Sequence, residues 1–154
     1  MRHSIRGLLE DLVRLTESNA RLELFHGSSS EKISGDIRMN ERDSGWFGNG
    51  FYLSAFPDYA KRWGAHVHKM TVSGKFAEVQ VIGNYKELRF DKDAAIADKE
   101  AGGTVGWIEN EHAWSSAFAK KLKQMGYDGI RVHFDENKDV EVVVFEPDKT
   151  ITAR

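Results

Sequence analysis

The chain has no cysteine among its 154 residues, which excludes disulfide bonds and thiolate metal sites. This absence is compatible with a reducing compartment. No apolar run reaches the roughly 20 residues that a membrane-spanning helix needs, and residues 1–5 begin no signal-peptide core. We therefore expect a cytoplasmic protein that does not enter a membrane.

The chain also lacks an excess of charge of either sign. It contains 22 Lys and Arg residues and 24 Asp and Glu residues, which gives a formal net charge of -2. Without an overall positive field, broad attraction to DNA or RNA is not expected. A hydrophobic fraction of 40% is ordinary for a folded domain with a core. Since no linker or repeat appears, we expect one α+β domain over residues 1–154.

Hydrophobic periodicity predicts both helices and strands, with a loop or short helix after residue 27. Apolar residues at helical spacing predict helices over residues 4–18 and 110–125, the second with Trp114, Phe118 and Leu122 on one stripe. Pro57 and Gly64 bound a short predicted helix over residues 58–63, and an Ala-rich, charged segment predicts a solvent-facing helix over 91–101. Alternating and β-branched runs predict strands over residues 21–26 and 51–55, a strand-like run over 65–81 interrupted at Ser73-Gly74, and a hairpin of 129–134 and 139–145. In the first strand, alternation predicts Leu22, Leu24 and His26 on one face.

Three short motifs carry the chemistry. His26-Gly27 ends the first predicted strand, Gly48-x-Gly50-x-Tyr52 opens the second, and Glu141 begins the run Glu-Val-Val-Val-Phe-Glu-Pro. In this order and spacing they resemble the His-Tyr-Glu site of ADP-ribosyltransferases of the diphtheria-toxin and poly-ADP-ribose-polymerase branch. The resemblance implies the ADP-ribosyltransferase fold, with two small packed antiparallel sheets, a cleft for NAD and flanking helices.

The same resemblance implies how NAD, the co-substrate, is bound. Binding is expected at His26, Gly27, Ser28, Tyr52 and Trp63. The histidine would hydrogen-bond the adenosine-side ribose, and the glycine backbone would hold the nicotinamide carboxamide. The two aromatic side chains would form the walls of the nicotinamide slot, where stacking and cation–π attraction favour a positively charged ring. For both Tyr52 and Trp63 the alternative of a core aromatic stays open.

Glu141 is the expected catalytic residue. When the bond between nicotinamide and ribose breaks, positive charge develops on the ribose, as on a sugar during glycoside hydrolysis. A carboxylate on a strand can be held rigidly beside that charge, so orientation and electrostatics suffice without a metal. The alternative is an exposed strand carboxylate, as most glutamates are.

Asp139 precedes Glu141 by two residues, so both side chains are expected on one strand face. In the resembling transferases this earlier position often contacts the acceptor. It is a glutamate in enzymes that modify arginine and a glutamine for several other acceptors, and the aspartate here matches neither. Ala60 also departs from polymerase-type members, which have a serine there.

The N-terminal third resembles one phage group more closely. The pattern Leu24-Phe25-His26-Gly27-Ser28, followed by Asp43-Ser44-Gly45-x-Phe47-Gly48, is similar to an anti-CRISPR ADP-ribosyltransferase that inactivates a type I-F complex. This implies a phage or mobile-element effector in the cytoplasm of a bacterial host. Its acceptor would be a macromolecule, in the first place a protein of the host or of a rival system.

Three other functions stay open. An NAD glycohydrolase would use water as the acceptor. An RNA 2′-phosphotransferase shares the fold but would require a more basic groove than this composition offers. A catalytically inactive relative would only bind NAD or a protein, although it would have no need of His26, Tyr52 and Glu141 together.

Weaker motifs support no site. His66 and His68 share a strand face, but no third metal ligand has suitable spacing, so no metal is expected. Arg38 and Arg42 could reach the diphosphate of NAD, although solvent-exposed arginines explain them as well. The glycines at 45, 48 and 50 precede a strand and lack the Lys-Ser or Lys-Thr of a phosphate-binding loop.

Overall fold

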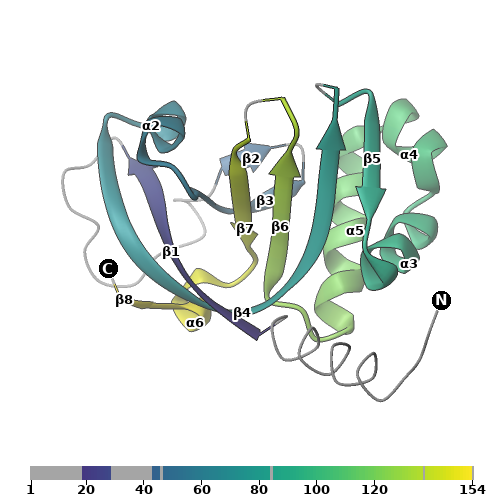
Figure 1. The fold of residues 1–154 in the computed structure, drawn as a ribbon. Coiled ribbons are helices and arrows are strands. Elements are labelled where there is room, and N and C mark those ends of the chain that lie inside the picture. The colour runs from purple at the N-terminus through teal and green to yellow at the C-terminus, as the bar shows by residue number, and fades with distance from the viewer. Residues whose placement is uncertain (1–18, 29–42, 46, 84, 137, 154) are drawn as a thin grey trace, which may run out of the picture.

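The computed structural model describes residues 19–28, 43–45, 47–83, 85–136 and 138–153. Within these ranges a strongly curved sheet is covered by helices on its outer side, in the expected α+β class (Figure 1). The predicted helix over residues 4–18 lies outside the described residues, as do Arg38 and Arg42.

The strands are β1 (Asn19–Ser28), β2 (Asp43–Gly45), β3 (Gly48–Ser54), β4 (His66–Ile82), β5 (Glu87–Phe90), β6 (Gly129–Phe134), β7 (Val140–Val144) and β8 (Ile151–Ala153). The helices are α2 (Pro57–Ala60), the 3₁₀ turn η2 (Lys61–Trp63), α3 (Lys92–Glu100), α4 (Gly103–Glu109), α5 (Glu111–Gln124) and α6 (Pro147–Thr150).

The strands run in the order β1-β3-β7-β6-β4-β5, and β4 also pairs with β1. Five strands therefore close into a ring, with β2 added to β3 and β8 added to β4. We expected two packed antiparallel sheets, and the structure joins their strands through β4. The pair β4–β6 is parallel, because the chain returns through α3, α4 and α5 before entering β6.

The 17-residue strand β4 changes partner along its length. Residues 66–75 pair with β1, and residues 76–81 pair with β6. The predicted interruption at Ser73-Gly74 is wrong, because these residues continue the β1 ladder opposite Arg21 and Ala20. Gly74 is needed for packing, since a Cβ there would lie 2.8 Å from the Oδ2 atom of Asp128.

Side chains alternate across the ring and form two cores. On β3, Phe51 and Leu53 belong to the inner core, while Tyr52 faces the helices. On β7, Val142 belongs to the inner core, and Val143 belongs to the core beneath the helices. Burial of the two faces fixes the register, because a slip of one residue would exchange them.

The helices α3 and α5 cover the outer face in agreement with the sequence. The predicted stripe of Trp114, Phe118 and Leu122 on α5 is fully buried. Asp91 and Asn110 cap α3 and α5 by accepting hydrogen bonds from backbone amides at 2.8 and 3.1 Å. The short elements β2, β5 and α4 were not predicted from the sequence. None of the described helices has the length and apolar character required to cross a membrane.

Candidate active site

The pairing of β3 with β7 brings Tyr52 and Glu141 to one face of the sheet. Ser54 lies opposite Glu141, and Tyr52 lies opposite Val143, so the tyrosine and the glutamate are diagonal neighbours. Such neighbours are separated by about 7–8 Å at the backbone, within reach of long side chains. Glu141 is only 8% exposed. The strand therefore holds a nearly buried carboxylate beside the tyrosine, which differs from the exposed alternative.

His26 lies near the end of β1, and its ring is on the inner side of the strands, opposite to the face that carries Tyr52 and Glu141. Its ring stacks on Phe51 of the inner core, with centroids 3.9 Å apart and an interplanar angle of 25°. Its Nδ1 donates a hydrogen bond of 2.8 Å to the main-chain oxygen of Tyr52. Because a carbonyl only accepts, Nδ1 carries the hydrogen, and in the neutral ring Nε2 is an acceptor. Burial lowers the pKa of His26 from its usual 6.5; the bond to the Tyr52 backbone opposes this shift, and nearby His68 adds to it.

Gly27 and Ser28 are packed against the segment that carries Trp63. A Cβ at Gly27 would lie 1.9 Å from the carbonyl oxygen of Ala60 in α2. Gly64, at φ 155°, lies equally close to the Ser28 backbone, where a Cβ would be 2.2 Å from its carbonyl carbon. We expected Gly27 to allow a ligand to approach. The structure shows a second reason for a glycine at this position: without a side chain, the end of β1 can contact α2 and the turn after η2.

Trp63 lies at the end of η2, half-buried, beside Tyr52. The two ring centroids are 6.1 Å apart, and the planes are inclined by 51°. Tyr52 itself is 2% exposed and belongs to the core beneath the helices, so it is both a core residue and a site candidate. The two aromatic side chains form a corner instead of parallel walls. The side chains of Tyr52, Trp63 and Glu141 are thus brought together, while that of His26 approaches from the other strand face.

Asp139 lies directly before β7 and is buried, with 1% of its surface exposed. Its Oδ1 accepts a hydrogen bond of 2.6 Å from the Ser54 hydroxyl. Its Oδ2 accepts one of 2.8 Å from Nη2 of Arg62. Asp139 therefore connects the end of β3, the start of β7 and η2. Its predicted contact with an acceptor stays a prediction.

Two further residues of this region were missed from the sequence. Arg62 bonds Asp139 and places its guanidinium carbon 4.6 Å from the centroid of Trp63. Tyr85, in the turn between β4 and β5, stacks on Trp107 at 6.5 Å and packs edge-on against Phe134 at 5.8 Å. Burial raises the pKa of the Tyr85 phenol, and the negative charge of Glu141 raises it further. Neither residue belongs to a motif, so only the folded chain reveals them.

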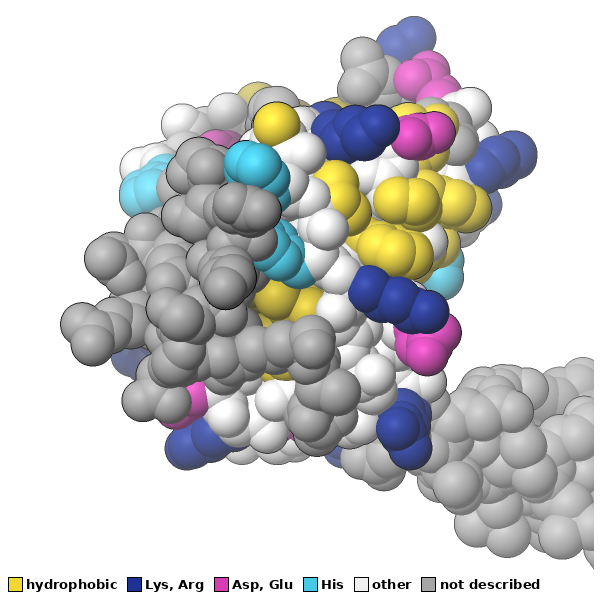
Figure 2. Space-filling view, turned by 90° about the vertical axis from the view of Figure 1, so that its left-hand side faces the viewer, with side chains coloured by type: hydrophobic (Ala, Val, Ile, Leu, Met, Phe, Trp, Pro, Cys, Tyr) yellow, Lys and Arg dark blue, Asp and Glu magenta, His cyan; other side chains and the backbone are white. Residues whose placement is uncertain are grey.

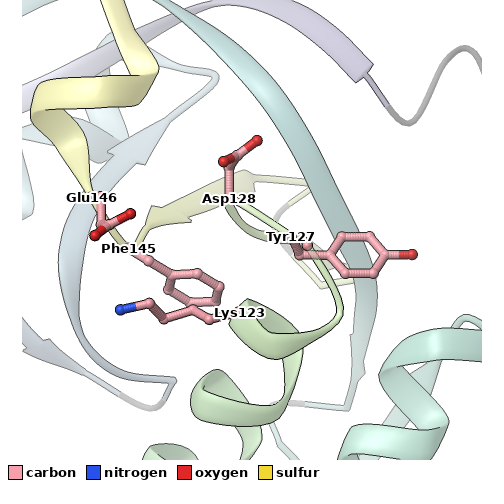
Figure 3. A pocket seen from close by; sticks show the side chains of 6 residues that line it. Lys123, Tyr127, Asp128, Phe145 and Glu146 are labelled. Atoms are coloured by element: carbon pink, nitrogen blue, oxygen red, sulfur yellow. The ribbon is translucent and has the colours of Figure 1, made fainter.

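Other surface features lie apart from these residues. Among the described residues, no three His, Cys, Asp or Glu side chains are grouped to hold a metal ion. A recess of about 160 Å³ is lined by Lys123, Gly126, Tyr127, Asp128, Phe145 and Glu146 (Figure 3). It shares none of the site residues, and Phe145 follows the far end of β7 from Glu141. On the face shown in Figure 2, hydrophobic side chains gather at the upper right with charged side chains around them, and histidines lie mainly toward the left and also at the right edge.

A sequence family described as "ADP-Ribosyltransferase in polyvalent proteins" matches residues 19–153. The chain belongs to this family. The ADP-ribosyltransferase fold expected from the motifs is thereby confirmed. A solved structure described as "Crystal structure of an anti-CRISPR protein" is 20% identical, covers 82% of this chain and 90% of its own, and superposes with a TM-score of 0.44. No curated protein sequence matches the chain.

Proposed function

We propose that this ADP-ribosyltransferase-family chain is an NAD-dependent mono-ADP-ribosyltransferase of the His-Tyr-Glu class. The observation that carries the proposal is the β3–β7 register, which places the nearly buried Glu141 on the face of Tyr52, beside the turn that ends in Trp63. Membership of the family supports the general activity. The residue roles rest on the motifs and on this geometry.

The donor set fits NAD on chemical grounds. A neutral His26 with its hydrogen on Nδ1 presents Nε2 as an acceptor for a ribose hydroxyl. The backbone of Gly27, at the end of β1, would hold the carboxamide, with Ser28 beside it. The corner between Tyr52 and Trp63 offers two electron-rich faces for a cationic ring, and such contacts contribute on the order of 0.5–2 kcal/mol.

Glu141 would act through its charge and its hydrogen-bonding capacity. Bound NAD supplies a nicotinamide that leaves as a neutral molecule while positive charge moves to the ribose. The Glu141 carboxylate, held by two neighbouring strands, accepts a hydrogen bond from the ribose hydroxyl and stabilises that charge. Burial strengthens this stabilisation, since water no longer screens the carboxylate.

The acceptor we propose is a protein, with water and RNA as the competing acceptors. Arg62, the cation bonded to Asp139, already uses two of its donors on Asp139 and on the Tyr59 backbone, so fewer remain for an RNA phosphate. The motif resemblance over residues 24–48 makes a protein of a bacterial defence system the first candidate, and a phage or mobile-element effector the corresponding biological role. The chain would then act in the host cytoplasm.

Labelled NAD, incubated with the purified protein and a bacterial lysate, tests this proposal. We expect label on a discrete protein band together with released nicotinamide, and no label when the protein carries Glu141→Gln. Free ADP-ribose without a labelled band would instead identify a glycohydrolase. Label that ribonuclease removes would identify an RNA acceptor, and the absence of nicotinamide release would indicate a binding module.

A further inference from the structure

Arg62 of η2 and Asp139, directly before β7, form an ion pair. The carboxylate side chain is fully buried, and the guanidinium side chain is 40% exposed. Asp139 stands two residues before Glu141, whereas Arg62 directly precedes Trp63. The 2.8 Å bond between Nη2 and Oδ2 therefore joins the residue beside the catalytic strand to the residue beside the aromatic wall.

The guanidinium of Arg62 is fixed by more than this bond. Its Nε donates a hydrogen bond of 2.8 Å to the main-chain oxygen of Tyr59. Its carbon lies 4.6 Å from the centroid of Trp63, within the range of a cation–π contact. The same carbon lies 5.6 Å from the centroid of the Tyr59 ring. Four contacts thus hold the planar group, and the group in turn covers part of the indole.

The carboxylate of Asp139 is equally fixed. Ser54, which donates to Oδ1 at 2.6 Å, is itself buried and lies opposite Glu141 in the β3–β7 ladder. The Ser54 hydroxyl oxygen also accepts the backbone amide of Phe56 at 3.1 Å. The carboxylate is consequently anchored to the strand pair that carries Tyr52 and Glu141.

We propose that Arg62 and Asp139 are a positioning pair that sets the indole of Trp63 relative to the strands bearing Tyr52 and Glu141. This inference rests on the proposed NAD chemistry for its catalytic meaning. A wall that is already held in its bound position loses less conformational freedom when the nicotinamide ring binds, so the pair should strengthen NAD binding. The role differs from contact with the acceptor, because Asp139 acts through Arg62 and Trp63.

Positioning of Trp63 predicts a characteristic kinetic change. The indole would contact the nicotinamide in the bound ground state as well as in the transition state. Loss of the pair should therefore raise KM for NAD more than it lowers kcat. A residue that oriented Glu141 alone would lower kcat instead. A residue that contacted only the acceptor would leave nicotinamide release into water unchanged.

The test compares Arg62→Met, Asp139→Asn and the double variant with the wild-type protein. We expect each single variant to raise KM for NAD roughly tenfold with kcat within about threefold, and the double variant to add little because both remove one interaction. A second readout uses the indole N–H signals of ¹⁵N-labelled protein, with that of Trp63 assigned by Trp63→Phe. Both single variants should move the Trp63 signal even in the absence of NAD.

Two matched variants keep the test interpretable. Arg89→Met removes the exposed pair Arg89–Glu87 and should change neither readout. Arg62→Lys retains a cation for Asp139 but loses the planar group from the indole. Because Asp139 keeps a positively charged partner, Arg62→Lys should fold even if Arg62→Met does not. Arg62→Lys should still move the Trp63 signal.

Several results would overturn the inference. An unchanged KM and an unmoved Trp63 signal in Arg62→Met and Arg62→Lys would reject the positioning pair. A loss of protein labelling in Asp139→Asn with normal nicotinamide release would place Asp139 at the acceptor instead. If the wild-type protein released no nicotinamide, the proposed function would fail, and the indole signal would still decide whether the pair orients Trp63.

Discussion

The Nδ1 atom of His26 donates a hydrogen bond of 2.8 Å to the main-chain oxygen of Tyr52, and this bond joins two strands that otherwise barely meet. Among the described residues, β1 pairs with β3 only at Phe25 and Ser54. The histidine side chain therefore has a structural function in addition to its proposed contact with ribose. Its protonation should affect both.

Acidification should destabilise the protein through His26. Its folded pKa lies below the usual 6.5, so between these two values the unfolded chain binds a proton that the folded chain does not. Stability should accordingly fall as the pH decreases below about 6.5. Urea unfolding at pH 8 and pH 5 would measure the loss, which should shrink in His26→Gln. His112→Gln, on the exposed surface of α5, should retain the full pH dependence.

Glu141→Gln should fold normally, bind NAD and release nicotinamide at least ~100-fold more slowly, equivalent to about 2.7 kcal/mol of transition-state stabilisation. The amide keeps the shape of the side chain but removes the charge that balances the developing cation. Steady-state release of nicotinamide and a thermal melt would check both statements. More than half of the wild-type rate in this variant would exclude Glu141 as the catalytic carboxylate.

Trp63→Ala and Tyr52→Ala should behave differently although both residues are predicted to contact nicotinamide. Trp63 is half-buried, so its loss should weaken NAD binding with a small change in melting temperature. Tyr52 is 2% exposed within the core, and its truncation should cost roughly 3–5 kcal/mol of stability, as for other large core aromatics. Calorimetric titration with a non-hydrolysable NAD analogue, alongside thermal melts, would separate the effects. Unchanged affinity in Trp63→Ala would assign the indole to the core.

Gly27→Ala should destabilise the fold by several kcal/mol, because the new Cβ would meet the Ala60 oxygen at 1.9 Å and displace α2. Gly126→Ala is a useful comparison, since its Cβ meets nothing within 4 Å and only its φ of 92° is unfavourable. That strain should cost about 1 kcal/mol. Equal losses in the two variants, measured by chemical unfolding, would show that β1 and α2 can separate freely.

Tyr85→Phe should retain the packing of the ring on Trp107 and Phe134 while removing the hydroxyl that feels the charge of Glu141. We expect an unchanged melting temperature and roughly tenfold slower nicotinamide release, since the variant removes a hydroxyl that lies within the electric field of Glu141. Wild-type turnover in this variant would show that the phenol serves packing alone.

The sequence predicted what local patterns determine. Alternation predicted the face of β1 on which Leu24 and His26 are buried, and helical spacing predicted the buried stripe of α5. The family resemblance predicted that Tyr52 and Glu141 belong to one site, and the β3–β7 register makes them diagonal neighbours. These features depend on neighbouring residues or on a motif.

The remaining features depend on long-range contacts. The continuity of β4 through Ser73-Gly74 comes from its partners on β1 and from space beside Asp128. The burial of Asp139 results from Ser54 and Arg62, which lie 85 and 77 residues away in sequence. No local pattern indicates that an aspartate before a strand will bond a guanidinium from a 3₁₀ turn. Sequence reasoning placed that carboxylate near the acceptor because only its spacing from Glu141 was visible.

The ring of strands also has one narrow seam. Every other junction in it is a ladder of several residue pairs, whereas the described part of the β1–β3 junction consists of one pair and the His26 side chain. Local opening costs least where the fewest backbone bonds must break. Local opening of the ring of strands should thus begin at the β1–β3 junction. The amides at the Phe25–Ser54 pair would then exchange with solvent ahead of those in the β6–β7 ladder. The strands would separate first beside His26 and Gly27, the residues proposed to bind NAD.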